Sequence, residues 1–275
     1  MEFYDGSLWQ EITDTASTYV GGFIPSANFQ TVIWPGNSTA RRISLSFQPD
    51  IVWVKKRSSA TSSDHCLVDS VRGPSTNLNI LYPNLAIAES TGVGSNYVES
   101  LDTDGFDIGT STYFNATSET YVAWSWKAGG TATTITAGTV NSNTVNSSVS
   151  ANTDAGFSIV SYTAPSSGIV RIAHGLGGVP DIVITKTYSV SGYNWYTWVK
   201  GMDTTSGYIY LDGDVGDQVA SGYNMWNNGF TSTTYEQNVG YSTISGASTI
   251  GYLWRSIPGY SKIGFYVGTG VATGP

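Results

Sequence analysis

The sequence predicts an all-β protein built from two tandem antiparallel β-sandwich units of jelly-roll type. Three observations point to this fold class. Short segments alternate apolar and polar residues, are rich in Val, Ile, Thr, Tyr and Trp, and are separated by Gly, Asn, Asp and Pro. Helical periodicity is weak, and its best candidate is residues 84–91. Several segments also occur twice, in the same order along the chain.

The expected strands follow one another at close spacing. They are DIVWVKK (50–56), TYVAWSWKA (120–128), FSIVSYTA (157–164), IVRIAHG (169–175), DIVITKT (181–187), NWYTWVKG (194–201), GYIYLDG (207–213), TIGYLWRS (249–256) and SKIGFYVG (261–268). Pro49 and Pro180 precede two of them, at the strand entry where a residue without an N–H is tolerated. Ile51 and Val52 point to opposite faces, so we expect this strand to be buried from both sides.

The repeated segments define the two units. Pro-Asp-Ile-Val occurs at 49–52 and 180–183, TDGFDIG at 103–109 resembles 227–233, and YVAWSWKAGG at 121–130 resembles 250–259. These common offsets indicate two diverged copies. We expect a lead-in at 1–21, a first unit at 22–130, a Ser/Thr/Asn-rich connection at 131–154, a second unit at 155–258, and a closing strand or the start of a third repeat at 259–275. The connection suits either an exposed edge strand or a flexible linker.

Composition excludes several classes of protein. Only 12% of the 275 residues are charged and the formal net charge is −8, so we expect no nucleic-acid partner, because such binding depends on clustered Lys and Arg. The sequence contains no run of 18 apolar residues, so we expect no membrane insertion. The N-terminal residues also lack the pattern of a secretory signal peptide. Cys66 is the single cysteine, which excludes an intrachain disulfide.

Residues with catalytic potential are sparse, and we expect no enzyme. His65 and Cys66 are adjacent on an expected strand and therefore point to opposite faces, while His174 lies in a Gly-rich turn. A glycoside hydrolase needs two carboxylates across one cleft. Acidic residues are available at Glu89, Glu99, Asp102, Asp104, Asp107 and Glu119, but mostly in turn contexts.

Calcium is the one ion that the sequence favours, and no other cofactor is expected. Asp212, Asp214 and Asp217 alternate in the Gly-rich segment LDGDVGDQ, with a weaker pair at Asp102 and Asp104. Neither group matches a complete calcium-binding loop. The alternative is that Asp-Gly makes hairpin turns.

Aromatic residues crowd the second unit, where glycan-binding candidates are Trp195, Trp198, Tyr208, Tyr223 and Trp226. Residues 195 and 198 of one strand face opposite sides, so we expect at least one of these large rings to lie outside the core. An exposed ring beside Asn, Asp and Ser can stack on a sugar. The alternative is that these rings fill a core or a subunit interface.

Several motifs together resemble a known family. FQPDIVWVKKR, SLDTDGFDIG, TYVAWSWKAGGTA, HGLGGVPDIVI and GYSKIGFYVGTGVATGP are similar to uncharacterised repeat modules in virion proteins of marine tailed phages, including tail-fibre and appendage proteins of cyanophages and pelagiphages. The start, MEFYDGSLWQEI, resembles the end of a fibre-stalk motif.

The resemblance implies a virion structural protein that is assembled in the host cytoplasm. It implies an exposed fibre or appendage module that contacts a host-surface glycan. The expected partners are two further copies of the chain, in a homotrimer, and other virion proteins. A purely structural spacer or capsid-decoration protein is the alternative. A tail-spike polysaccharide hydrolase is a third possibility.

Overall fold

The computed structural model describes residues 23–58, 63–73, 78–91, 96–140, 144–214, 224–227 and 229–266, together with the backbone of strands β1 (Glu2–Tyr4), β2 (Trp9–Glu11) and β17 (Gln218–Val219). The described chain is nearly all β, which confirms the predicted class. Its helical segments are the single turns η1 (Pro25–Ala27) and α1 (Thr112–Asn115).

The helix expected at 84–91 is wrong, because this segment is irregular apart from a bridge between Ser90 and Ile80. Its backbone groups bond to a distant loop instead of to each other. Glu89 N–H donates to Tyr188 O at 2.9 Å, and Ala86 O accepts from Gly192 N–H at 2.6 Å.

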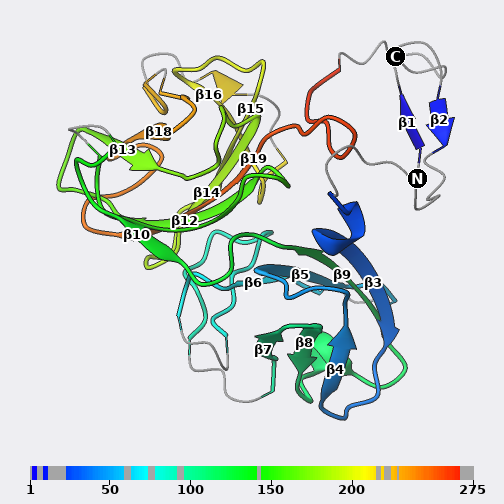
Figure 1. Cartoon of the computed structure of the whole chain (residues 1–275). Helices are drawn as coiled ribbons and strands as arrows, with labels where there is room; N and C mark the ends of the chain where they lie inside the picture. The colour runs from blue at the N-terminus through cyan, green and yellow to red at the C-terminus, as the bar shows by residue number, and fades with distance from the viewer. Residues whose placement is uncertain are drawn as a thin grey trace.

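The N-terminal half of the described chain forms two facing antiparallel sheets (Figure 1). The larger has the order β3 (Phe29–Pro35), β9 (Thr120–Trp126), β5 (Ile51–Lys56), β6 (Cys66–Asp69), and the smaller has the order β4 (Arg41–Ser44), β8 (Gly105–Ile108), β7 (Val98–Asp102). An apolar core that includes Trp34, Phe106 and Tyr121 fills the space between them.

The C-terminal half repeats this arrangement with a larger main sheet. Its order is β10 (Thr133–Ile135), β11 (Ser147–Asn152), β12 (Phe157–Thr163), β19 (Ser248–Trp254), β14 (Ile182–Thr187), β15 (Trp195–Val199), β16 (Gly207–Tyr210), β17. Strands β13 (Ile169–Ala173) and β18 (Thr234–Asn238) form the facing pair.

The connection at 131–154 and the expected last strand have different outcomes. The Ser/Thr/Asn-rich connection contains all of β10 and β11, so it supplies the edge strand of the main sheet and the strand next to it. The expected strand at 261–268 is absent over 262–266, where the chain is irregular after a bridge between Ile257 and Ser261. Residues 267–275 lie outside the described residues.

The two main sheets share strand order and register. The order β3-β9-β5-β6 corresponds to β12-β19-β14-β15, and all neighbours are antiparallel. Phe29 and Ile51 both pair with Trp126, and in the second sheet Trp254 is the corresponding partner of Phe157 and Ile182.

The repeated Pro-Asp-Ile-Val motif ties one strand's entry to another strand's exit. The backbone N–H groups of Asp50 and Asp181 donate to the carbonyls of Trp126 and Trp254, both at 2.8 Å. Each carboxylate then accepts a backbone N–H two residues beyond that tryptophan, from Ala128 and Ser256, both at 2.7 Å. The motif is therefore part of the scaffold.

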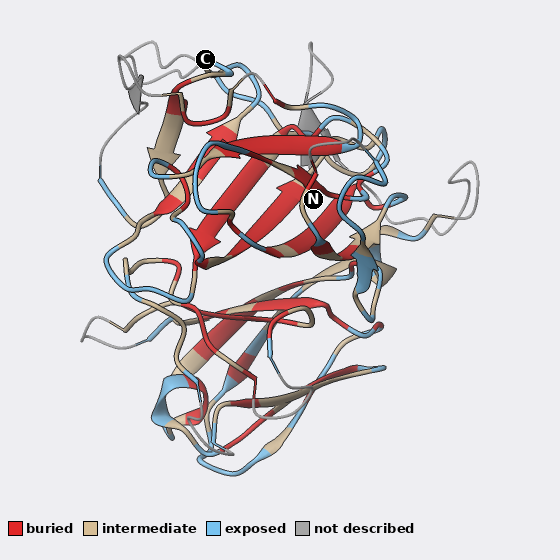
Figure 2. Ribbon diagram, turned by 90° about the vertical axis from the view of Figure 1, so that its left-hand side faces the viewer, coloured by how far each residue is buried: buried red, intermediate tan, exposed pale blue. Residues whose placement is uncertain are grey.

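The main sheets also pack against each other, which produces four layers and three cores. The shared core between them includes Ile51, Leu67, Leu81, Phe157, Ile159, Ile184, Trp195, Ile250 and Tyr252. Figure 2 shows the strands of the upper main sheet buried along most of their length. Because both faces of each main sheet are covered, Ile51 lies in the shared core while Val52 lies in the N-terminal core, as the sequence predicts.

Candidate functional site

The predicted aromatic platform is not exposed. Trp195 and Trp198 do point to opposite faces of β15, Trp195 into the shared core and Trp198 into the core beneath β13 and β18. The expectation that one of these rings lies outside the core is wrong, because the sheet is covered on both sides. Both side chains are buried.

The remaining aromatic candidates do not form an exposed platform either. Trp226 is fully buried and its Nε1–H donates to Gly207 O at 2.8 Å. With no exposed ring face, the three tryptophans cannot stack on a sugar, so this part of the prediction is wrong. Tyr208 is half-buried against Tyr196 and Tyr210, and Tyr223 lies outside the described residues.

The predicted calcium ligands do not form a cluster in the described chain. Asp212 Oδ1 accepts the Trp195 N–H at 3.0 Å, while Oδ2 is buried without a hydrogen-bond partner. Asp214 is exposed and Asp217 lies outside the described residues. Among the described residues, no three metal-ligating side chains are grouped, and calcium stays a prediction.

Asp102 and Asp104, the weaker candidate calcium ligands, both form ion pairs with an arginine. Arg42 forms ion pairs with Asp102 at 2.8 Å, with Asp107 at 2.5 Å, and with Asp104. These exposed carboxylates are therefore partly neutralised.

A buried lysine was missed by sequence reasoning. Lys186 lies on β14 and is fully buried, with its ammonium donating to Tyr193 O and standing 6.0 Å from the Trp195 ring centroid. Burial lowers the pKa of Lys186 to about 8, against the opposing field of Asp212. A lysine on an alternating strand normally indicates a solvent face, so no local signal reveals this position.

The candidate bases are held in structural contacts. His65 Nδ1 accepts the Trp53 indole N–H at 2.9 Å, and Cys66 lies buried in the N-terminal core, where burial raises its pKa to about 12. His174 Nδ1 accepts the Leu176 N–H at 3.1 Å, and its Nε2 donates to Thr231 O at 3.2 Å. Its ring is fully buried, which lowers its pKa to about 4.

One buried ionic network joins the two halves. Arg72 donates to Asp69 Oδ2 and Glu89 Oε2, both at 2.7 Å, and the Tyr252 hydroxyl donates to the same Asp69 oxygen at 2.6 Å. Arg72 also stands 5.6 Å from the ring centroid of Tyr188. Glu89, a carboxylate considered for hydrolysis, is thus committed to this network.

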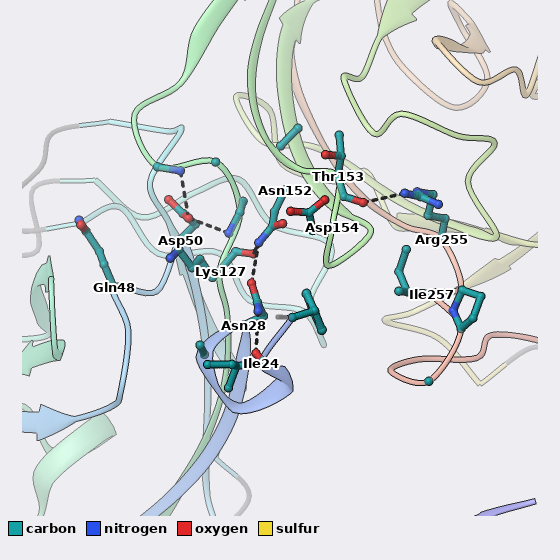
Figure 3. Close-up of a pocket in the computed structure, with 18 residues that line it drawn as sticks. Ile24, Asn28, Gln48, Asp50, Lys127, Asn152, Thr153, Asp154, Arg255 and Ile257 are labelled. Carbon is teal, nitrogen blue, oxygen red and sulfur yellow. Dashed lines mark hydrogen bonds between the residues drawn. The ribbon is translucent and has the colours of Figure 1, made fainter. Parts of the chain in front are cut away.

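A cleft with a volume of about 1020 Å³ lies at the junction of the two main sheets (Figure 3). We call it the junction cleft. Its walls come from the η1 turn and flanking residues before β3, the segment before β5, the segment after β9, the β11–β12 turn and the segment after β19. The labelled polar residues in it are Asn28, Gln48, Asp50, Lys127, Asn152, Thr153, Asp154 and Arg255.

Hydrogen bonds fix much of this cleft. Asn152 Nδ2 donates to Asn28 Oδ1 at 2.8 Å and so closes the two halves across its floor, while Arg255 Nη2 donates to Thr153 O at 2.6 Å. The side chains of Lys127 and Asp154 are exposed and make no hydrogen bond or ion pair with other described residues. The positive charge of Lys127 acts on the Asp50 carboxylate, so what the cleft offers is one ammonium and one carboxylate that have no hydrogen-bond partner among the described residues.

Two cations of the cleft follow corresponding strands of the two main sheets. Lys127 directly follows β9, and Arg255 directly follows β19. Sequence reasoning missed this site because its walls are far apart in the chain. The segments KAGG (127–130) and RSIP (255–258), which differ between the copies, were the available signal.

A family profile for a domain of unknown function, DUF7483, matches residues 24–275. The chain belongs to the DUF7483 family. No curated protein and no solved structure matches it. The DUF7483 region includes both main sheets and, apart from Phe23, every residue that lines the junction cleft. Across the described DUF7483 residues, no helix has the length and apolar character needed to cross a bilayer.

Proposed function

We propose that this DUF7483 protein is a non-enzymatic structural module of a phage virion, exposed on a fibre or appendage, whose junction cleft contacts a glycan of the host surface. It consists of two tandem copies of one β-sandwich unit. The common strand order and register of the two main sheets support the duplication. The phage-like motifs and the sparsely charged composition support the virion assignment.

The junction cleft is the observation that carries the glycan contact. Its volume of about 1020 Å³ is at the upper end of the range of small-molecule sites, about 300–1,000 Å³. Amides, a free ammonium and a free carboxylate offer partners for sugar hydroxyls. Ile24, Ile257 and Pro258 add apolar surface that suits the C–H face of a sugar ring.

The same geometry favours binding over hydrolysis. Glycoside hydrolysis generally uses two carboxylates on either side of the scissile bond. In the cleft, the Asp50 carboxylate already accepts from Ser70 Oγ, Ala128 N and Gly130 N, which leaves Asp154 as the free acid among the described lining residues. We accordingly propose a binding module without enzymatic activity.

A structural spacer or capsid-decoration role is the second candidate. Burial of Trp195, Trp198 and Trp226 and the continuous shared core favour it, because they describe a rigid building block. Under either role we propose a homotrimer and other virion proteins as partners, within an assembled virion.

An array of host polysaccharide fragments tests the glycan contact. We expect the wild-type protein to bind a subset of glycans, and Lys127→Ala and Asp154→Asn each to weaken that binding about tenfold or more, as loss of a hydrogen bond to a charged group predicts. Lys262→Ala, which removes an exposed lysine outside the cleft, serves as the matched control.

The outcomes separate the candidates. Absence of binding by the wild-type protein across host polysaccharides favours the spacer role. Binding that survives both cleft substitutions places the glycan elsewhere. Release of reducing ends from host polysaccharide contradicts the non-enzymatic assignment.

A further inference from the structure

Strand β3 is an open edge of the first main sheet. It is seven residues long, and β9 is its single strand partner in the described structure (Figure 1). At its ends, Asn28 O accepts from Lys127 N–H at 2.9 Å and Gly36 N–H donates to Glu119 O at 2.8 Å. These bonds show that the even-numbered residues exchange hydrogen bonds with β9.

The odd-numbered residues therefore turn their backbone groups outward, because hydrogen-bonded and non-bonded pairs alternate along an antiparallel ladder. The outward groups belong to Phe29, Thr31 and Ile33. No described residue donates to or accepts from their outward backbone groups. Pro35, the next outward-facing residue, has no N–H, so the outward donors end at Ile33.

The second main sheet shows what this edge accommodates. There, β12 occupies the position of β3, but its outer side is covered by β11, with Asn152, Ser150 and Ser148 opposite residues 157, 159 and 161. Ser150 pairs with Ile159, which corresponds to Thr31 of the first sheet. The same framework thus accepts an extended strand at the edge that β3 leaves open.

Other strand edges in the described structure carry features that discourage pairing. Arg42 on β4, Asp102 on β7, Arg171 on β13 and Glu236 on β18 place charge there, and the outer side of β6 is bridged to Leu81. Strands β1, β2, β10 and β17 have three residues or fewer.

Between Phe29 and Ile33, strand β3 lacks these features; the Arg41 guanidinium, which donates to Pro35 O, lies beyond this stretch at the end of the strand. Its sequence, FQTVIWP, has no charged residue, and the Ile33 side chain is 57% exposed. A long, uncharged edge with exposed apolar surface is a template for pairing with another chain.

We propose that the outer edge of β3 pairs antiparallel with β3 of a second copy of this chain, about a two-fold axis at Thr31. This register places Ile33 opposite Phe29 of the partner subunit on one face, and the outward residues exchange about six backbone hydrogen bonds. The strand is self-complementary because no like charges meet. The two four-stranded sheets become one sheet of twice the width, an isologous contact. This contact is independent of the glycan site and of the proposed trimer.

Engineered disulfides test the register. Directly opposite residues of a hydrogen-bonded pair have Cα atoms about 5.5 Å apart, within the range for a disulfide of about 4.4–6.8 Å. Thr31→Cys should therefore give a covalent dimer under mild oxidation, while Thr117→Cys, an exposed turn position, gives only background linking. The native thiol of Cys66 is buried and does not interfere.

Edge substitutions test the association itself by sedimentation over a range of concentrations. Ile33→Lys adds a charge, and Thr31→Pro removes an outward N–H without touching the bonds to β9. Each should weaken dimerisation about tenfold or more while leaving the thermal melting of the monomer nearly unchanged. The proposal is overturned if the wild-type species does not double in mass with concentration, if that doubling survives both substitutions, or if Thr31→Cys and Thr117→Cys link equally.

Discussion

The buried network at Arg72 yields the sharpest prediction about stability. Arg72→Met removes a side chain that donates to Asp69, to Glu89 and to Asn79 O, the last at 3.3 Å, while keeping a similar apolar stem. Both Arg72 and Asp69 are about 1% exposed or less as side chains. Breaking a buried ion pair by removing one partner costs about 3–5 kcal/mol, because the remaining charge is left without compensation.

The structure places the expected loss near the lower end of this range. After the substitution, Asp69 still accepts the Tyr252 hydroxyl and the backbone N–H groups of Val71 and residue 72, both at 2.9 Å. Glu89, whose side chain is 15% exposed, can recover water. We therefore expect a loss of about 3 kcal/mol, which lowers the melting temperature by about 6–12 °C for a chain of this size.

Urea unfolding followed by tryptophan fluorescence measures this loss as a shift in midpoint at an unchanged slope. Arg42→Met is the matched control, since Arg42 forms its ion pairs at the surface and should contribute about 1 kcal/mol or less. Adding Asp69→Asn to Arg72→Met should cost less than the sum of the two single losses, because the second change removes the uncompensated charge. A loss for Arg72→Met no larger than that for Arg42→Met would refute the reasoning.

Three further predictions follow from burial. Trp195→Ala should cost about 3–5 kcal/mol in unfolding free energy, because it empties part of the shared core, without changing glycan affinity of the folded protein. Burial holds the pKa of His174 at about 4 in the fold, whereas the unfolded chain binds this proton below about 6.5. Stability should therefore fall by about 3 kcal/mol between pH 6.5 and 4 in thermal melts, and His174→Gln should flatten this part of the curve. Asp50→Asn should cost about 1–3 kcal/mol in urea unfolding, because an amide cannot accept all the hydrogen bonds that this carboxylate accepts; an unchanged midpoint would contradict this role of Asp50.

Strands with a strong local signal were predictable, whereas β3, β4, β6, β7, β8 and β18 were not among the expected segments. Alternation of apolar and polar residues, with many β-branched and aromatic side chains, predicted β5, β9, β12, β14, β15 and β19 close to their observed bounds. The proposed helix at 84–91 failed because its backbone bonds to Tyr188 and Gly192 rather than within the segment. Such a long-range competitor leaves no mark on local periodicity.

The candidate site was less predictable. Crowded aromatics indicated either a binding surface or a core, and composition alone does not distinguish these. Trp195 and Trp198 are buried because separate layers cover the two faces of β15. The junction cleft depends on residues 28, 127, 152 and 255, which only the packing of the two main sheets brings together.

The sequence by itself determined the all-β class, the recurrence of several segments and the scaffold role of the Pro-Asp-Ile-Val strand entries. Each of these rests on residues close in the chain or on the repetition of a local pattern. Tertiary structure decided which faces of the sheets are covered, where Arg72 and Lys186 are buried, and where a cleft remains open. These depend on which sheet packs against which, because burial is a property of the assembled layers and not of any one strand.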